Sequence, residues 1–262
     1  MSGKDTEAGG DPNSFAKSSA TQAEPIKVLD SIEAVRSRPK MYIGTDPQAG
    51  LIYLLDAAIG TLLSAAAREI GSVVDKSLYG DTRNIEITFH AARIVTIADD
   101  GPGLSPQPLS PNSTKSLAER LLTELFTAMP EFVVTNAVSQ WLELKVWRDG
   151  YQWEQNYREG RPQDEFRKIC ASEKHGNSIR FAPDPVFFAD TEYDFDQVVQ
   201  WFRERAPKLE HKIAELTPND HAWYEKALRK EHSLFQNACF TICDERPLSS
   251  SARGERRITF NG

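Results

Sequence analysis

The sequence has few cysteines and no long hydrophobic run. Its 262 residues include three cysteines, at positions Cys170, Cys239 and Cys243. An odd and sparse set of cysteines does not form a disulfide framework, and no further Cys or His pair completes a zinc site. No apolar stretch reaches the length of about 18 residues that a membrane helix needs, and the polar N-terminus does not resemble a secretory signal. We therefore expect no metal site, no membrane segment and a location in the reducing cytoplasm.

Positive charge is in the minority. Lys and Arg total 31 against 38 Asp and Glu, which gives a formal net charge of −7. Because contacts between Lys or Arg and phosphate dominate affinity for DNA, direct DNA binding by this chain alone is not expected. The hydrophobic fraction of 40% is sufficient for the core of one large domain.

Large apolar residues are almost missing from the first 24 positions, where Phe15 is the exception. A segment rich in Ser, Ala, Gly and Thr cannot bury enough surface to offset the entropy lost on ordering. We therefore predict a disordered tail over residues 1–24 and one folded domain over 25–262. Within that domain, the charged residues 206–232 are predicted to form an additional helical segment.

Hydrophobic periodicity predicts a mixture of helices and strands. Helical spacing of apolar residues predicts helices over 28–38, 114–128 and 195–205. Residues 50–70 are apolar nearly all round and contain no proline, which predicts a long, buried helix. Alternating apolar and polar residues predict strands over 85–90, 93–98, 141–148, 151–158, 177–181 and 238–244. Asp149-Gly150 is typical of a hairpin turn between two of these strands. Helices mixed with mostly antiparallel strands indicate an α+β fold, built as a two-layer α/β sandwich.

A rare motif follows the first predicted helix. Residues 38–44 read Arg-Pro-Lys-Met-Tyr-Ile-Gly. This motif resembles the opening of the ATP-binding domain of the bacterial DNA gyrase B and topoisomerase IV ParE family. Other segments resemble that family in the same order along the chain: 50–51, 97–104, 134–139 and 175–181. The resemblance covers about residues 26–262 and implies the GHKL ATPase fold, in which helices cover one face of a mixed, mostly antiparallel sheet.

The resemblance implies that the adenine side of a nucleotide site is kept. Asp99 matches the family's carboxylate that accepts a hydrogen bond from the exocyclic amine of adenine. Gly101 and Gly103 follow it in the family's Asp-Gly-x-Gly box, and glycine lets the backbone approach a ligand closely. Asn177 stands where the family has a threonine near adenine. The implied cofactor contacts are therefore Asp99, Gly101, Gly103 and Asn177, and the resemblance implies at most weak ATP binding.

The catalytic groups of the family are missing. Its general base is a glutamate on the first long helix, and an asparagine four residues later holds Mg²⁺. When the chain is aligned on Gly50, the glutamate position is Ala57 and the asparagine position is Thr61. The resemblance therefore implies no catalytic residue at these positions, and Mg²⁺ is not expected.

Two further assignments of the general base remain open. An alternative alignment uses residues 73–76, which resemble the family's Val-Val-Asp-Asn, and places Ser72 and Lys76 at the two positions. Asp56 is a weak candidate, because one step around a helix turns a side chain by about 100° away from the glutamate position. Both alignments lose both catalytic groups.

The phosphate-binding lid is also reduced. The family's lid is a glycine-rich loop whose backbone amides cradle phosphates, whereas no glycine occurs here between Gly103 and Gly150. No counterpart of the family's transducer, TOPRIM or DNA-cleavage domains is expected. The sequence thus predicts a hydrolysis-deficient pseudoenzyme related to type II DNA topoisomerases, acting as a binding or regulatory module. The candidate partners are a second copy or a gyrase or topoisomerase subunit. The alternative is the ATPase subunit of a split topoisomerase-like complex that a partner chain completes.

Overall fold

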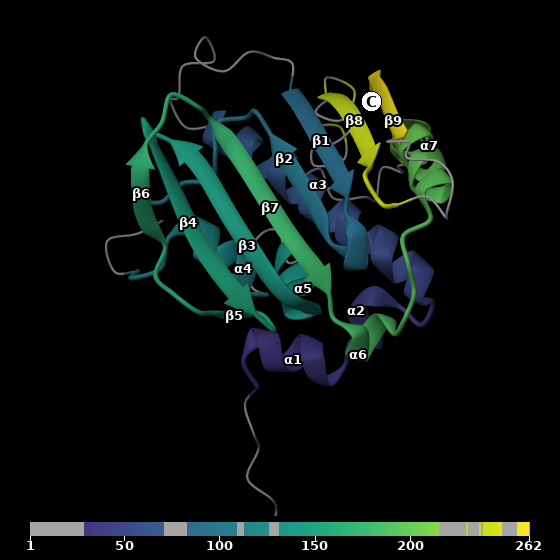
Figure 1. Cartoon of the computed structure of the whole chain (residues 1–262), viewed down its shortest axis with the longest axis horizontal. Coiled ribbons are helices and arrows are strands. Elements are labelled where there is room, and N and C mark those ends of the chain that lie inside the picture. The colour runs from purple at the N-terminus through teal and green to yellow at the C-terminus, as the bar shows by residue number, and fades with distance from the viewer. Residues whose placement is uncertain are drawn as a thin grey trace, which may run out of the picture.

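A computed structural model describes residues 29–70, 83–108, 113–125, 131–214, 229, 236, 238–247 and 256–261. Within these residues, nine strands form one sheet in the order β5-β4-β3-β7-β2-β1-β8-β9, and β6 pairs with β4. All neighbouring strands are antiparallel except β1 and β8, which run parallel (Figure 1). The strands are β1 (Arg83–Phe89), β2 (Val95–Asp99), β3 (Ser139–Arg148), β4 (Tyr151–Arg158), β5 (Arg161–Pro162), β6 (Arg167–Ala171), β7 (Gly176–Pro183), β8 (Ala238–Asp244) and β9 (Arg256–Asn261).

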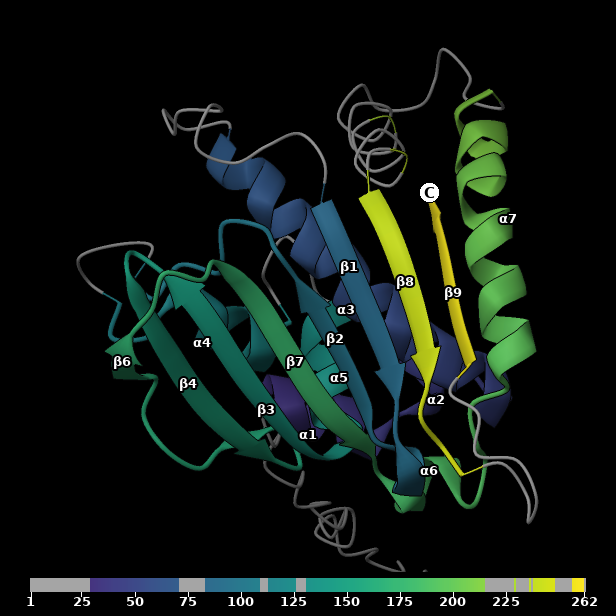
Figure 2. The ribbon, with the colours of Figure 1, turned by 45° about the horizontal axis from the view of Figure 1, so that its top comes forward.

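Helices cover one face of this sheet. The long helix α3 crosses behind it, and α5 packs against α1, α3 and α4 (Figures 1 and 2). Strand β2 shows why one face is covered, since Val95 and Ile97 are fully buried whereas the intervening Thr96 is partly exposed. The helices are α1 (Ser31–Ser37), α2 (Lys40–Ile43), α3 (Pro47–Ile70), α4 (Leu117–Thr123), α5 (Glu131–Ala137), α6 (Pro185–Phe188) and α7 (Phe195–Ala214), with a short 3₁₀ turn over Ala91–Arg93.

Helix α7 closes the side of the sheet that ends in β8 and β9 (Figure 2). The ring of Phe202 lies 5.2 Å from that of Phe240 on β8 and 5.9 Å from that of Phe260 on β9, measured between ring centroids. Such aromatic contacts add to the burial of apolar area. The predicted α+β sandwich, with a mixed and mostly antiparallel sheet, is therefore confirmed.

Most of the predicted elements are present, with two changes of length. The predicted helix 114–128 is shorter in the structure, because the backbone leaves the helix after Thr123 and the N–H of Leu125 donates to the Ser31 hydroxyl at 3.0 Å. Helix α7 runs on to Ala214 and takes in the start of the predicted charged segment. Strands β5, β6 and β9 were not predicted; every residue of β6 is exposed, so it has no apolar alternation to detect. The predicted disordered tail 1–24 and residues 215–228 lie outside the described residues.

A compact ion cluster stands at the end of β8. The side chain of Asp244 is only 3% exposed, and Arg246 donates to it from Nε at 2.7 Å and from Nη2 at 2.9 Å. Arg256 on β9 adds a third charged donor at 2.8 Å. Burial by itself would raise the pKa of Asp244, but the hydrogen bonds from Arg246 and Arg256 outweigh it and hold this pKa at about 2.

This cluster makes part of the stability depend on pH. The pKa of Asp244 is 3.8 in the unfolded chain and about 2 in the folded protein, so the unfolded state binds more protons between these pH values. The stability that Asp244 contributes is therefore fully present above pH 3.8 and is lost as the pH falls to about 2. We expect Asp244 to account for about 2 kcal/mol of the loss in unfolding free energy on acidification. Urea unfolding of the wild type and Asp244→Asn at several acidic pH values measures this. A difference between the two proteins that stays constant with pH would contradict it.

Candidate functional site

A turn with the sequence Asp-Asp-Gly-Pro-Gly, residues 99–103, follows the C-terminal end of β2. Asp99 is the last residue of this strand, is 8% exposed, and shares the buried face with Val95 and Ile97. One carboxylate oxygen, Oδ1, accepts a hydrogen bond from the N–H of Gly101 at 2.7 Å. The Asp99 carboxylate therefore lies on the face of the sheet that the helices cover.

Asn177 occupies the other side of this carboxylate. Strands β2 and β7 pair Asp99 with Asn177, and the Asn177 amide donates to Asp99 Oδ2 at 2.8 Å. The carbonyl oxygen of the same amide accepts from the N–H of Leu104 at 2.8 Å. Asn177 is only 3% exposed, so this chain of hydrogen bonds is buried. Both oxygens of Asp99 thus already hold donors from the protein itself.

The glycines of the turn contact protein backbone. Gly103 has φ +73°, and a Cβ placed there would lie 2.7 Å from the carbonyl oxygen of Trp147 on β3. Arg148, the last residue of β3, donates to the Gly103 carbonyl at 2.9 Å. Gly101 is buried as well. The close approach that requires glycine at position 103 is therefore an approach to β3.

Helix α3 carries the two positions that the family resemblance assigns to catalysis. Ala57 is 5% exposed and Thr61 is 2% exposed. The Thr61 hydroxyl donates to the Ala57 carbonyl at 2.8 Å, one helical turn back. The helix is continuous from Pro47 to Ile70, so the register from Gly50 to Thr61 is unbroken. The alternative positions at Ser72 and 73–76 lie outside the described residues.

Asp56 is engaged by another helix. Its Oδ1 lies 2.7 Å from Nη1 of Arg205 on α7, whose side chain is only 9% exposed. The Asp56 side chain is 36% exposed and forms the outer end of this ion pair. The Asp56 carboxylate is therefore engaged in a contact between α3 and α7.

The two positions on α3 that the resemblance assigns, Ala57 and Thr61, offer no carboxylate to a Mg²⁺ ion. Mg²⁺ is held by oxygen ligands, often carboxylates, whereas Ala57 has none and the single hydroxyl of Thr61 is bonded within the helix. In the described part of the chain, no group of three or more His, Cys, Asp or Glu side chains is placed to hold a metal ion. Nor is any helix in that part long and apolar enough to cross a membrane.

Three residues that brace the turn were not anticipated from the sequence. The Arg148 guanidinium holds Gly103, the His175 ring lies 2.6 Å from the Asp100 carbonyl through Nδ1, and the Asn84 N–H donates to the Asp100 carboxylate at 2.8 Å. Arg148 and His175 are 45 and 75 positions from their partners, and Asn84 is 16 positions away. No local pattern signals contacts of that range.

The sequence is similar to curated gyrase proteins. The DNA gyrase B protein of Thermotoga maritima is 33% identical over 230 residues, which cover 82% of this chain and 33% of that protein. The DNA gyrase B protein of Clostridium acetobutylicum is 34% identical over 212 residues, covering 75% and 31%. The B-type subunit of the type 2 topoisomerase of Aquifex aeolicus is 32% identical over 222 residues, covering 78% and 26%. The chain thus spans 26–33% of the length of these relatives, and no family model matches it.

A solved structure has the same fold. It is the 43K ATPase domain of Thermus thermophilus gyrase B in complex with an aminocoumarin, with a TM-score of 0.64 and 21% sequence identity. The match covers 89% of this chain and 52% of that one. The chain, with its mixed sheet and the helices on one face of it, therefore has the fold of GHKL ATPase domains. Within that class, the chain belongs to the DNA gyrase B and topoisomerase IV ParE family, over the family's ATPase domain.

Proposed function

We propose that this chain is a pseudoenzyme of the gyrase B family, a domain that does not hydrolyse ATP and serves as a binding or regulatory module in DNA topology. The observation that carries the proposal is the pair Ala57 and Thr61 on α3, where a methyl group and an internally bonded hydroxyl stand at the positions of the general base and the metal ligand. Loss of a positioned general base lowers a rate by about 10²–10⁴. Loss of the metal ligand lowers it further.

The state of Asp99 supports weak binding of adenine. An incoming amine has to share Asp99 Oδ2 with the Asn177 amide or displace it. Displacement leaves a buried amide without its acceptor, which costs about 1–3 kcal/mol. Binding of an adenine nucleotide is therefore expected to be weak and to gain nothing from Mg²⁺.

Calorimetric titration of the full chain with a non-hydrolysable ATP analogue, with and without Mg²⁺, tests the proposal. We expect a Kd above about 100 μM, no difference on adding Mg²⁺, and no ATP turnover in a steady-state assay. Asp99→Asn serves as the matched control, because any binding through the adenine contact should disappear in it. Tight, Mg²⁺-dependent binding of the analogue together with ATP turnover would contradict the proposal.

A second candidate is the ATPase subunit of a split topoisomerase completed by a partner chain. It is favoured by the relatives, which are named as subunits of gyrase and type 2 topoisomerase and are about three to four times as long as the matched region. The same turnover assay, repeated with a gyrase or topoisomerase subunit added, separates the two. If the added subunit stimulates ATP turnover and this turnover is lost in Asp56→Ala, the second candidate is supported. If no ATP turnover occurs with the added subunit, the result counts against the second candidate.

A further inference from the structure

The side-chain amide of Asn177 joins two groups of the turn that follows β2. Its Nδ2 donates to Asp99 Oδ2 at 2.8 Å, and its Oδ1 accepts from the N–H of Leu104 at 2.8 Å. We call these two hydrogen bonds the Asn177 bridge. Since an ionised carboxylate only accepts and a backbone N–H only donates, the two partners fix which end of the amide faces each of them. The Asn177 bridge therefore ties the start of the turn to its end.

Burial and strand pairing hold the Asn177 bridge in place. Asp99, Leu104 and Asn177 are all buried, and Asn177 stands directly opposite Asp99 in the pairing of β7 with β2. The other oxygen of Asp99 accepts from the N–H of Gly101 at 2.7 Å. Rotation of the Asn177 amide out of the turn would take a buried partner from Asp99 and from Leu104 at once, which is unfavourable.

The two groups that the bridge occupies form a pattern that a nucleobase also matches. One amide contacts both of them, so the acceptor of Asp99 and the donor of Leu104 lie side by side. The Watson–Crick edge of adenine carries the complementary pair on one carbon, a donor at the exocyclic amine and an acceptor at N1. The amide of asparagine also carries a donor and an acceptor on one carbon. The Asn177 amide and the adenine edge therefore present the same hydrogen-bonding groups.

We propose that Asn177 is a built-in substitute for adenine at this turn. Its amide takes the hydrogen-bonding positions of the base on Asp99 and Leu104 and so opposes nucleotide binding. This inference rests on the adenine contact at Asp99 in the proposed function and adds the residue that blocks that contact. The turn thereby keeps its hydrogen bonds without a ligand, which suits a binding module that works in the absence of nucleotide.

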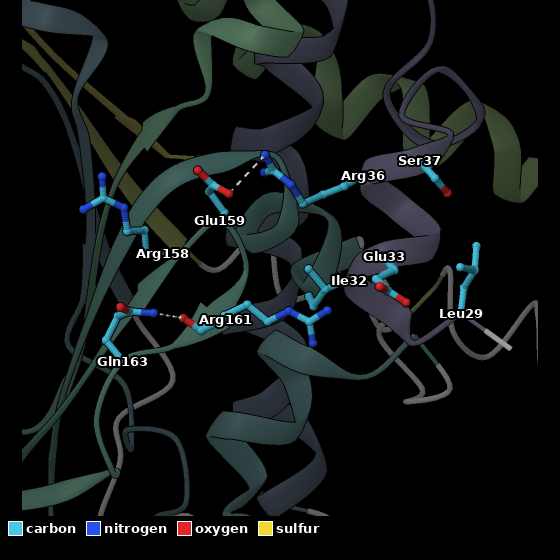
Figure 3. A pocket seen from close by; sticks show the side chains of 9 residues that line it. All are labelled: Leu29, Ile32, Glu33, Arg36, Ser37, Arg158, Glu159, Arg161 and Gln163. Carbon is cyan, nitrogen blue, oxygen red and sulfur yellow. Dashed lines mark hydrogen bonds and ion pairs between the residues drawn. The ribbon is translucent and has the colours of Figure 1, made fainter. Parts of the chain in front are cut away.

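A separate pocket of about 610 Å³ lies between α1 and the hairpin that joins β4 to β5 (Figure 3). All of its lining residues come from 29–37 and 158–163, so neither Asp99 nor Asn177 is among them. A nucleoside that bound in this pocket would be unaffected by a substitution at Asn177. Such a substitution therefore separates binding at the turn from binding in the pocket.

Asn177→Ala removes the bridge and tests the proposal on the full chain. With Asp99 and Leu104 released, adenosine can bind to both, and we expect its affinity in calorimetric titration to rise about tenfold or more over the wild type. Purine riboside lacks the exocyclic amine and should gain less than about threefold. Loss of the bridge should also lower the midpoint of thermal unfolding by about 2–4 °C or more, and adenosine should restore part of this loss in the variant.

Asn156→Ala is the matched control, because the Asn156 amide on β4 also donates to an aspartate, Asp164, at 2.8 Å. This variant should lose stability without gaining affinity for adenosine. Asn177→Thr supplies a second variant, with a β-branched side chain that suits a strand. Its single hydroxyl cannot replace both ends of the amide, so the affinity for adenosine should rise here as well.

An unchanged affinity for adenosine in both Asn177 variants would overturn the proposal. An equal gain for purine riboside, or an equal gain in Asn156→Ala, would overturn it too. Hydrogen exchange of the wild type gives a test that does not depend on the variants. The Leu104 amide should be protected from exchange without any ligand, and rapid exchange would contradict the bridge.

The assay of ATP turnover tests the proposed function separately, since Ala57 and Thr61 are unchanged in every variant. Turnover in Asn177→Ala would contradict the proposed pseudoenzyme but not the Asn177 bridge. Conversely, absent turnover together with an unchanged affinity for adenosine would contradict the bridge and leave the pseudoenzyme standing.

Discussion

Gly176→Ala is expected to lower the free energy of unfolding by roughly 4 kcal/mol or more, a large share of the roughly 5–15 kcal/mol that stabilises a typical domain. Gly176 begins β7 with φ +114°, a backbone conformation that residues with a side chain rarely adopt. A Cβ at this position would lie 1.9 Å from the carbonyl oxygen of Asp99 and 2.8 Å from its carbonyl carbon. Since both strands are held in the middle of the sheet, neither can move aside without breaking the pairing between β2 and β7.

Gly150→Ala is the matched control for this substitution. Gly150 also has a positive φ, +77°, but a Cβ there meets nothing within 4 Å. Its replacement should therefore cost only about 1 kcal/mol, the usual penalty for a side chain in this region. Urea unfolding followed by circular dichroism measures both variants. If the two lose the same stability, the clash with Asp99 does not decide the fold.

Arg36→Ala is expected to lower the free energy of unfolding by roughly 3–5 kcal/mol. The Arg36 side chain joins three elements, because it donates to Ala137 at the end of α5 and to Asp184, which caps α6, and its guanidinium lies 4.9 Å from the centre of the Phe187 ring. The Asp184 side chain is only 6% exposed. Removing the guanidinium leaves this buried carboxylate without its cation, and this unpaired charge is the main source of the loss.

Arg161→Ala removes an arginine whose ion pair is exposed. Its ion pair with Asp30 is as short, at 2.7 Å, but the two side chains are 50% and 49% exposed. Exposed pairs contribute about 0–1 kcal/mol, so this variant should remain within about 1 kcal/mol of the wild type. Thermal or urea unfolding of both variants under identical conditions decides the matter. Equal losses would contradict the assignment of the Arg36→Ala loss to the buried Asp184 carboxylate and the other buried contacts of Arg36.

The candidate site was partly accessible from sequence. Asp99 and Gly103 stand in one short motif, so their proximity follows from the turn itself. The position of Asn177, 78 residues further on, was suggested by the family resemblance, but its hydrogen bond to Asp99 depends on the register of β2 against β7. Because of that contact, Asp99 is not an open hydrogen-bond acceptor but already accepts a hydrogen bond from the Asn177 amide. In the same way, the Asp56 carboxylate already has a cationic partner, Arg205.

The sequence by itself determined the type of fold and most of its elements. The continuous apolar character of α3 and the alternation along β3 and β4 are local patterns, because they depend only on residues that are neighbours in the chain. Only the tertiary structure decided which polar groups are satisfied, because donors and acceptors such as Asn177 and Asp99 meet through strand pairing over long distances in the chain. The pocket between α1 and the β4–β5 hairpin arises in the same way, since residues 120 or more positions apart form its opposite walls.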